Sequence, residues 1–313
     1  MALDEATTAL LTQLAESGTK PLHEMTPQEA RGLTAMLGGM YGPGPDMHRA
    51  EDAAAPRPDG TSVPLRVLVP TERPRGVIVY YHGGGWVIGA LPEFETLGRK
   101  LAERTGCAVV LVDYRMAPED PYPAAADDAF TAVQWVAAHV ADIAGGEVPL
   151  LVAGDSAGGN LAAIVTQKAR AAGGPAIAMQ VLVYPVTDCD LDNGSYTDPA
   201  NQLMLSRESM VWFWDLYAPE HAMRQNPDAC PSKADDLSGL PPAVVLLAEH
   251  DVLRQEGQEY ADALEAAGVP VQCRVFEGQM HGFFTMANVL PGSDAGIAYV
   301  AEAVDRRLTA QPA

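Results

Sequence analysis

The chain has 313 residues, of which 48% are hydrophobic and 19% are charged, a balance typical of a folded globular protein. Its 41 acidic residues outnumber its 20 basic ones and give a formal net charge of -21. A surface of this sign repels nucleic-acid phosphates and anionic lipid headgroups, so we expect no nucleic-acid partner and no membrane attachment.

The first 45 residues are expected to form two helices that lie against the main body of the protein. Leu10, Leu11 and Leu14 recur at helical spacing between acidic residues, and Thr26 followed by Pro27 is typical of a helix N-terminus. The chain starts with acidic residues where a secretory signal peptide carries basic ones, and no apolar run is long enough to cross a bilayer. We therefore expect a soluble protein of the cytoplasm.

From residue 62 onward, short apolar runs alternate with helix-forming segments. We expect strands at residues 63–69, 76–81, 108–112, 150–153, 179–184, 243–248 and 271–276. We expect helices at residues 92–104, 124–140, 160–171, 255–267 and 294–308. Alternation of this kind is typical of the α/β class, in which helices cover both faces of a mostly parallel sheet.

A glycine-rich loop, His82-Gly83-Gly84-Gly85-Trp86, follows the strand expected at residues 76–81. Consecutive glycines let backbone N–H groups turn toward a ligand without interference from side chains. The glycine spacing from 83 to 89 also resembles a dinucleotide-binding loop, but the apolar residues 86–88 favour a continued extended segment over the start of a helix. We therefore expect the loop to stabilise negative charge in a reaction and to bind no nicotinamide cofactor.

The segment 149–161, PLLVAGDSAGGNL, joins an apolar strand to a helix through the pattern G-x-S-x-G, with Ser156 at its centre. A strand that turns abruptly into a helix holds the middle residue in a strained backbone conformation with its hydroxyl pointing outward. Gly154 and Gly158 provide the space that such a turn needs. The alternative is an ordinary turn that caps a helix, but the strand before and the helix after favour a nucleophilic serine.

Residues 189–240 interrupt the alternation with a segment too long for a simple connection. Its aromatic-rich helix at residues 207–217 contains Trp212, Phe213 and Trp214, which either form a packed helix face or, as we favour, belong to a lid over the site. We therefore divide one catalytic domain into N-terminal cap helices (1–45), a first core segment (46–188), a cap insertion (189–240) and a second core segment (241–313).

A serine hydroxyl needs a base to accept its proton, and the base needs a carboxylate to orient it. Three histidines follow Ser156 in the sequence: His221, His250 and His281. His221 falls in the insertion, and His250 ends a strand beside Asp251, where adjacent side chains point apart. His281 lies in the loop between the last strand and the last helix, from which an imidazole reaches back over the sheet, so we assign it as the base.

Asp251 is the candidate for the carboxylate, because it opens a loop at the carboxyl end of an apolar strand, where active sites of open α/β sheets gather. Glu249 and Glu256 are its rivals. Glu249 is expected to face away from Asp251, and Glu256 falls within the following helix. Asp251 would hold the Nδ1 proton of His281 and stabilise the imidazolium that forms.

With these residues in place, the chain resembles the hormone-sensitive-lipase-like esterases (the bacterial family IV carboxylesterases) of the α/β-hydrolase superfamily. The resemblance covers most of the chain from about residue 62 onward and rests on separate blocks in the family's order: HGGGW (82–86), VDYRMAPE (112–119), GDSAGGNLA (154–162), YPVTD (184–188), Asp251 with its loop, and His281-Gly282-Phe283.

The resemblance implies roles beyond the triad. It names the backbone N–H groups of Gly83, Gly84 and Ala157 as oxyanion donors, and it makes Tyr114 and Arg115 braces of nearby loops. It also implies a reaction that needs no metal and no cofactor, a small-molecule ester as the partner, and homodimers in some members. One departure is that a valine follows Asp251 where the family usually has a proline, which affects the pocket wall more than catalysis.

The substrate pocket is expected to draw on the elbow, the glycine loop, the loops that carry the triad and the aromatic helix of the insertion. Its candidate residues are Trp86, Asp155, Met210, Phe213, Trp214, Val252, Leu253 and Phe283.

Four cysteines lie far apart in the sequence and form no C-x-x-C pair. Cys107 and Cys273 occur in apolar or strand-like runs and are expected to be buried thiols. Cys189 and Cys230 can pair only if the fold brings them together, which the sequence leaves open. A reduced protein is the default expectation.

The predicted function is a serine carboxylesterase acting on short- to medium-chain acyl esters through an acyl-enzyme intermediate. An amidase, a lactonase or a deacetylase with the same triad is the alternative within the enzymes. A third possibility is a non-catalytic ligand-binding relative of the same fold, but such proteins typically lose the histidine, and this chain retains His281.

Overall fold

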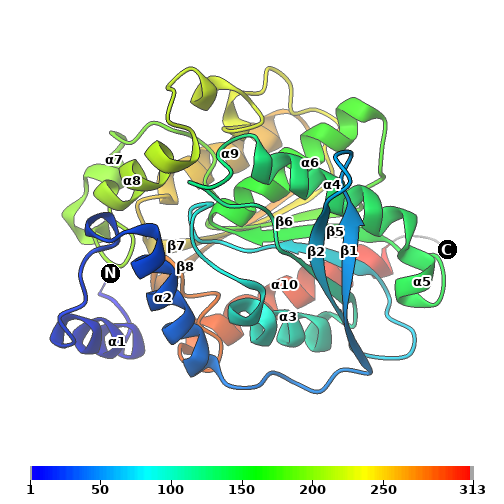
Figure 1. The fold of residues 1–313 in the computed structure, drawn as a ribbon, viewed down its shortest axis with the longest axis horizontal. Coiled ribbons are helices and arrows are strands. Elements are labelled where there is room, and N and C mark those ends of the chain that lie inside the picture. The colour runs from blue at the N-terminus through cyan, green and yellow to red at the C-terminus, as the bar shows by residue number, and fades with distance from the viewer. Residues whose placement is uncertain (1, 311–313) are drawn as a thin grey trace.

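The fold is built on one eight-stranded sheet, as a computed structural model that describes residues 2–310 shows (Figure 1). The strand order is β1-β2-β4-β3-β5-β6-β7-β8, and the strands are β1 (Arg49–Pro56), β2 (Ser62–Val69), β3 (Val77–Tyr81), β4 (Ala108–Val112), β5 (Leu150–Asp155), β6 (Met179–Val183), β7 (Ala243–His250) and β8 (Val271–Met280). The pairs from β4–β3 to β7–β8 are parallel, whereas β1–β2 and β2–β4 are antiparallel. The predicted mostly parallel sheet of an α/β protein is therefore confirmed.

Helices cover both faces of this sheet, with α4, α6 and α9 on one face and α3 and α10 on the other (Figure 1). The helices are α1 (Glu5–Glu16), α2 (Pro27–Gly38), α3 (Leu91–Thr105), α4 (Ala124–Ala138), α5 (Val140–Ala144), α6 (Ala157–Ala172), α7 (Gly194–Thr197), α8 (Arg207–Tyr217), α9 (Arg254–Ala266) and α10 (Pro291–Thr309). None of the helices among residues 2–310 is long and apolar enough to cross a membrane.

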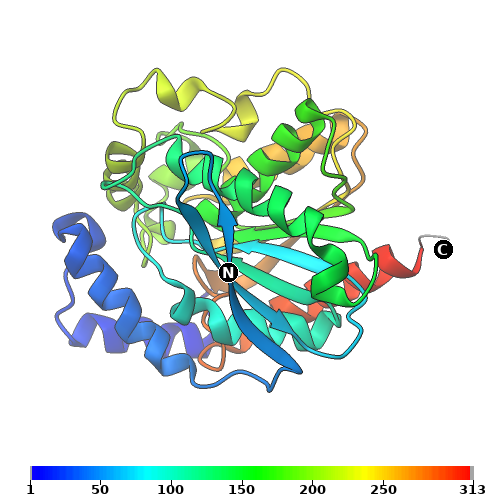
Figure 2. The same ribbon diagram turned by 45° about the vertical axis from the view of Figure 1, so that its right-hand side comes forward.

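Strand β1 is the one strand that the sequence pattern did not predict. It reads RAEDAAAP, and only Ala55 within it is buried. An edge strand pairs on one side alone and has a solvated face, so it needs no apolar run. Figure 2 shows this strand and β2 as a twisted ribbon that extends beyond the rest of the sheet.

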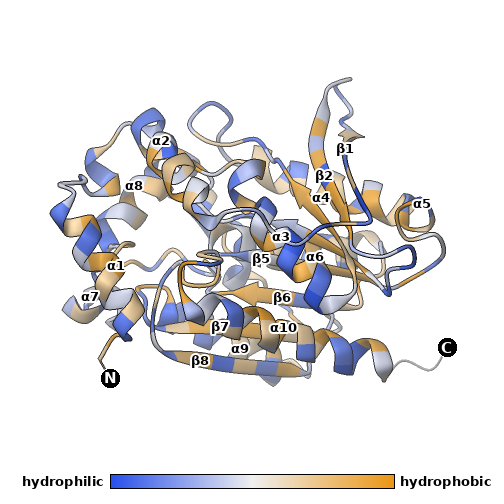
Figure 3. Cartoon of the chain, turned by 90° about the horizontal axis from the view of Figure 1, so that it is seen from below, coloured by the Kyte–Doolittle hydropathy of each residue, from blue (hydrophilic) through white to orange (hydrophobic). Residues whose placement is uncertain are grey.

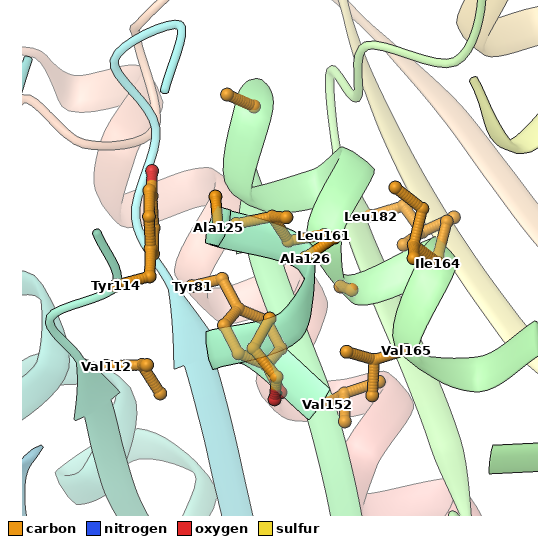
Figure 4. Packing of buried hydrophobic residues seen from close by; sticks show 14 of the residues in the cluster. Tyr81, Val112, Tyr114, Ala125, Ala126, Val152, Leu161, Ile164, Val165 and Leu182 are labelled. Carbon is orange, nitrogen blue, oxygen red and sulfur yellow. The ribbon is translucent and has the colours of Figure 1, made fainter. Parts of the chain in front are cut away.

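Alternate residues of each central strand pack into separate cores on the two faces of the sheet. Val79 and Val152 pack with α4 and α6, whereas Ile78 and Leu151 pack with α3 and α10. Figure 4 shows part of the first core, where Leu161 of α6 lies over the strands. Strands that are buried on both faces are apolar throughout, and this composition made them evident in the sequence. In Figure 3, where orange marks hydrophobic residues, β6 and β7 are largely orange.

Helices α1, α2, α7 and α8 gather on one side of the molecule, on the left in Figures 1 and 3. Helix α2 starts with a capping box, in which the side chains of Thr26 and Glu29 satisfy each other's backbone N–H groups. Arg31 of α2 donates hydrogen bonds to the backbone oxygens of Val87 and Ala117. Because Val87 lies in the glycine-rich loop after β3, this contact joins the N-terminal helices to the candidate site.

Candidate active site

Ser156 stands at the turn from β5 into α6, in a backbone conformation that a non-glycine residue rarely adopts, with φ 55° and ψ -119°. The turn leaves no room for side chains beside it. A Cβ added at Gly158 would lie 1.9 Å from the backbone oxygen of Tyr81, and one at Gly154 would lie 2.2 Å from that of Gly158. A hydrogen bond of 2.8 Å from the N–H of Ser156 to Val183 O holds the turn against β6.

The structure brings His281 and Asp251 to Ser156. The Nε2 atom of His281 lies 3.0 Å from Ser156 Oγ, and its Nδ1 atom lies 2.7 Å from Asp251 Oδ2. Asp251 follows β7 and His281 follows β8, and these neighbouring strands end on the same side of the sheet as β5. The carboxyl group of Asp251 is fully buried, and its Oδ1 accepts the N–H of Leu253 at 2.9 Å. This arrangement can move a proton from the serine hydroxyl to the imidazole while the carboxylate holds the ring.

The rival acids have other partners. Glu249 Oε2 accepts the N–H of Gly278 at 2.7 Å, and Glu256 Oε1 accepts the N–H of Thr187 at the same distance. Glu256 is fully buried, and burial raises its pKa well above the usual value for a carboxyl group. His221 is exposed in the insertion.

The predicted oxyanion donor Gly83 requires a correction. Its N–H donates to Asp155 Oδ1 at 2.9 Å, so this donor is already engaged. Within the described chain, the N–H groups of Gly84 and Gly85 have no hydrogen-bond acceptor. Ala157 is the first residue of α6, where N–H groups lack partners inside the helix. The free donors around the elbow therefore include those of Gly84, Gly85 and Ala157, and Gly85 is a candidate that the sequence interpretation did not name.

Asp155 joins the nucleophile turn to the glycine loop. Its side chain is buried, and besides the N–H of Gly83 it accepts the hydroxyl of Tyr80 at 2.7 Å. Burial raises the pKa of Asp155 to about 6, against the opposing effect of these two hydrogen bonds. These two contacts make Asp155 a positioning residue for the loop. The contribution of Tyr80 had no signal in the sequence, because its partner is distant in the chain.

The glycine loop folds into a tight turn and does not continue as an extended segment. Trp86 has a φ of 60°, and the N–H groups of Val87 and Ile88 both bond to Gly84 O, at 3.0 and 2.9 Å. The expectation of an extended chain at residues 86–88 is therefore wrong. The physical reason is that the positive φ angles of Gly84 and Gly85 reverse the backbone before the apolar residues begin.

His82, the first residue of the loop motif, is part of the scaffold. Its ring stacks between Phe94 and Tyr114, at centroid distances of 4.9 and 4.4 Å. Burial lowers the pKa of His82 to about 4, so the ring is neutral at physiological pH. The hydroxyl of Tyr114 donates to the backbone oxygen of His82 at 2.7 Å, which is the bracing contact expected of this tyrosine.

Arg115 braces a second loop through a buried carboxylate. Its guanidinium and its backbone N–H both donate to Asp128, at 2.9 to 3.0 Å. Arg57 donates two more hydrogen bonds to the same carboxylate, at 2.7 and 2.8 Å. Asp128 therefore holds the chain after β4 against α4, in line with the structural role predicted for Arg115.

All eight pocket candidates are buried. Trp86 stacks on Tyr217 at a centroid distance of 4.1 Å and meets Trp214 at 4.8 Å, so these rings form an aromatic cluster between the loop and α8. Phe213 lies against the glycine loop, because a Cβ at Gly85 would lie 2.1 Å from its ring. The remaining five candidates are also nearly inaccessible to solvent: Asp155, Met210, Val252, Leu253 and Phe283.

A cavity of about 390 Å³ lies elsewhere, beside α7 and the start of α9. It is lined by Ser195, His250 and Gln255 among others, and it contains none of the pocket candidates. The position of the acyl pocket therefore stays a prediction.

Comparison with known proteins identifies the family to which the chain belongs. A family model described as the alpha/beta hydrolase fold matches residues 78–285, which include the glycine loop and the whole Ser-His-Asp group. The chain belongs to this family. The α/β hydrolase resembles a solved hyperthermophilic esterase from the archaeon Pyrobaculum calidifontis, with a TM-score of 0.91 and 34% identity over 98% of this chain and 99% of that one.

Two curated relatives narrow the family further. This α/β hydrolase is 42% identical over 257 residues to the carboxylesterase NlhH of Mycobacterium tuberculosis, covering 80% of this chain and 78% of the relative. It is 33% identical over 314 residues to the ethyl acetate hydrolase of Pseudomonas putida, covering 96% and 98%. The predicted membership of the carboxylesterases that resemble hormone-sensitive lipase is confirmed.

Proposed function

We propose that this α/β hydrolase is a serine carboxylesterase in which Ser156 is the nucleophile, His281 the general base and Asp251 the group that orients the base. The observation that supports this most strongly is the continuous line of contacts, 2.7 Å from Asp251 to His281 and 3.0 Å from His281 to Ser156. The strained turn at Ser156 adds to it, since strain of this kind is common at functional sites.

The reaction follows from this geometry. Ser156 Oγ attacks the ester carbonyl while His281 Nε2 takes its proton, and the negative charge on the carbonyl oxygen meets the N–H groups of Gly84, Gly85 and Ala157. Each preorganised donor of this kind stabilises a transition state by about 2.7–4 kcal/mol. His281 then returns the proton to the departing alcohol, and water attacks the acyl-serine with the same base.

We also propose that residues 1–45 and 189–240 form a cap over this site. Phe213 of α8 lies against Gly85, and Arg31 of α2 holds the backbone of Val87, so both segments contact the glycine loop. Movement of either segment would therefore change the space above the donors. The ring of Phe213 limits the space beside Gly85, which favours short- to medium-chain acyl groups over long ones.

The proposal is tested with a panel of p-nitrophenyl esters of increasing acyl length, assayed beside the matched p-nitroanilides. We expect kcat/KM to be highest for short and medium acyl chains and the anilides to be hydrolysed far more slowly. Faster hydrolysis of the anilides would favour an amidase, and preference for lactones or for acetylated amines would favour the other two alternatives. No turnover of any substrate by the folded protein would favour a ligand-binding relative.

Two further predictions concern the cellular compartment and the oligomeric state of the protein. We place the protein in the cytoplasm, because its four cysteines are free and a reducing compartment keeps them so. A homodimer is the second prediction, and sedimentation velocity measures it directly. A monomer at all concentrations would contradict it without affecting the proposed chemistry.

A further inference from the structure

The fold brings Cys189 and Cys230 together. Their Sγ atoms lie within 4.8 Å of each other, although both thiols are free. Cys189 is the first residue of the insertion and Cys230 lies near its end, so the pair joins the two ends of this segment at its base. Cys230 is fully buried, whereas Cys189 is only half-buried and is the thiol that a small reagent reaches.

The surroundings of Cys189 favour its thiolate. A hydrogen bond from the thiol of Cys230 lowers the pKa of Cys189, against the opposing effects of burial and of the charge of Asp188, and the charges of Lys233 and Arg224 lower it further. The same hydrogen bond raises the pKa of Cys230. Gln225 Nε2 lies 3.6 Å from the sulfur of Cys189 and donates to it. A thiolate is the nucleophilic form of cysteine, so one partner of the pair is activated and the other is placed to resolve it.

We propose that Cys189 and Cys230 are a redox-active dithiol that hydroperoxides convert into a disulfide. The thiolate of Cys189 attacks one peroxide oxygen, the O–O bond breaks, and the sulfur becomes a sulfenic acid as hydroxide leaves. The sulfur of Cys230 then attacks the sulfur of Cys189, the S–O bond breaks, and the second oxygen takes the proton of the Cys230 thiol and leaves as water. The proton that Cys189 released on ionisation neutralises the hydroxide from the first step. In sum, two thiols are oxidised and one hydrogen peroxide is reduced to two waters.

A metal site is the competing interpretation, because Asp188 lies within the same group. In the described part of the chain, this group offers only three ligands, whereas a structural zinc site takes four. The ammonium of Lys233 also lies 2.8 Å from Asp188 Oδ1 and 3.1 Å from Oδ2, so the carboxylate is already neutralised. The two sulfurs are therefore better placed for each other than for a cation.

The disulfide would act on the base of the cap and leave the reacting atoms untouched. Asn160, one turn of α6 after Ser156, donates from its side chain to Val186 O and Ala229 O, which lie just before each end of the pair. A covalent bond would fix this junction and close a loop of about 40 residues, which restricts the unfolded chain. We expect the oxidised protein to unfold at a higher temperature than the reduced protein.

The test treats the full-length protein with hydrogen peroxide, alkylates the remaining thiols with iodoacetamide under denaturing conditions, and analyses the peptides by mass spectrometry. We expect a peptide pair cross-linked through Cys189 and Cys230 that a reducing agent separates, with a matching rise and fall of the melting temperature. Cys189→Ser and Cys230→Ser abolish the cross-link, whereas the matched control Cys273→Ser, on the half-buried thiol of β8, retains it.

Three results would overturn the proposal. The first is oxidation of Cys189 to a sulfinic acid while Cys230 stays free for alkylation. The second is a protein in which neither thiol reacts with peroxide. The third is protein-bound zinc that both thiols are needed to hold. This inference does not depend on ester hydrolysis, so its failure and the failure of the proposed function are separate outcomes.

Discussion

Replacing Asp251 with asparagine tests how the base is oriented. The two oxygens of Asp251 have different partners: Oδ1 accepts the buried N–H of Leu253 at 2.9 Å, and Oδ2 faces Nδ1 of His281 at 2.7 Å. In the Asp251→Asn variant only one of these atoms remains an acceptor. Leaving the N–H of Leu253 without a partner costs about 1–3 kcal/mol, so the amide oxygen keeps the Oδ1 position. The NH₂ group then faces His281.

The consequence is a change of tautomer. An NH₂ group facing Nδ1 makes that atom an acceptor, so the proton of His281 moves to Nε2, which can no longer accept from Ser156. A comparable substitution in serine proteases lowers kcat about 10⁴-fold, which corresponds to about 5.5 kcal/mol of transition-state stabilisation. We expect a loss of this size in the steady-state hydrolysis of p-nitrophenyl acetate.

The assay needs a control for the substitution itself. Asp262→Asn makes the same chemical change on the exposed side of α9 and should leave kcat unchanged. Both variants are melted to show that they fold. A loss in Asp251→Asn of less than about tenfold, in a folded protein, would refute the orienting role of this carboxylate.

Three further predictions concern the nucleophile and the buried acids. Ser156→Ala should lower kcat by about 10⁶-fold without changing the melting temperature, and ester turnover close to that of the unmodified protein would contradict its role. Asp128→Ala leaves two arginines without their buried carboxylate and should lower the free energy of unfolding by about 3–5 kcal/mol in a denaturant titration. Asp305 is exposed and also pairs with an arginine, so Asp305→Ala should change the free energy of unfolding by less than about 1 kcal/mol. Equal losses of stability in the two variants would show that burial of the Asp128 ion pairs makes no difference. The pKa of Asp155 is raised to about 6, so the folded protein keeps the proton of this carboxyl group at pH values where the unfolded chain has lost it. The free energy of unfolding should therefore fall as the pH rises from about 4 to about 6. Asp155→Asn should remove this part of the pH dependence, and an unchanged slope would show that another group causes it.

Much of the fold was predictable because its central strands are buried on both faces. Runs such as residues 108–112 are short and apolar at every position, which is typical of a strand that is buried on both faces. The residues of the Ser-His-Asp group were predictable for a different reason, because each follows a strand and the carboxyl ends of neighbouring parallel strands lie side by side.

The features that the sequence did not predict depend on contacts between segments that are distant in the chain. Strand β1 is solvated on one face and has no apolar pattern, so its pairing with β2 is evident only in three dimensions. Which of the three adjacent glycines can donate an N–H to the oxyanion depends on Asp155. Its carboxylate accepts the N–H of Gly83, whereas the N–H of Gly85 stays free. The proximity of Cys189 and Cys230 likewise depends on how the ends of the insertion meet, which no local sequence pattern encodes.

The proposed ester hydrolysis depends on Ser156 as its nucleophile. It is tested most directly by treating the protein with diethyl p-nitrophenyl phosphate and locating the phosphoryl adduct by peptide mass spectrometry while the remaining activity is measured. We predict one adduct, on Ser156, that forms in proportion to the loss of esterase activity and is absent from the Ser156→Ala variant. Complete loss of activity with Ser156 unmodified, or full activity with Ser156 phosphorylated, would contradict the account.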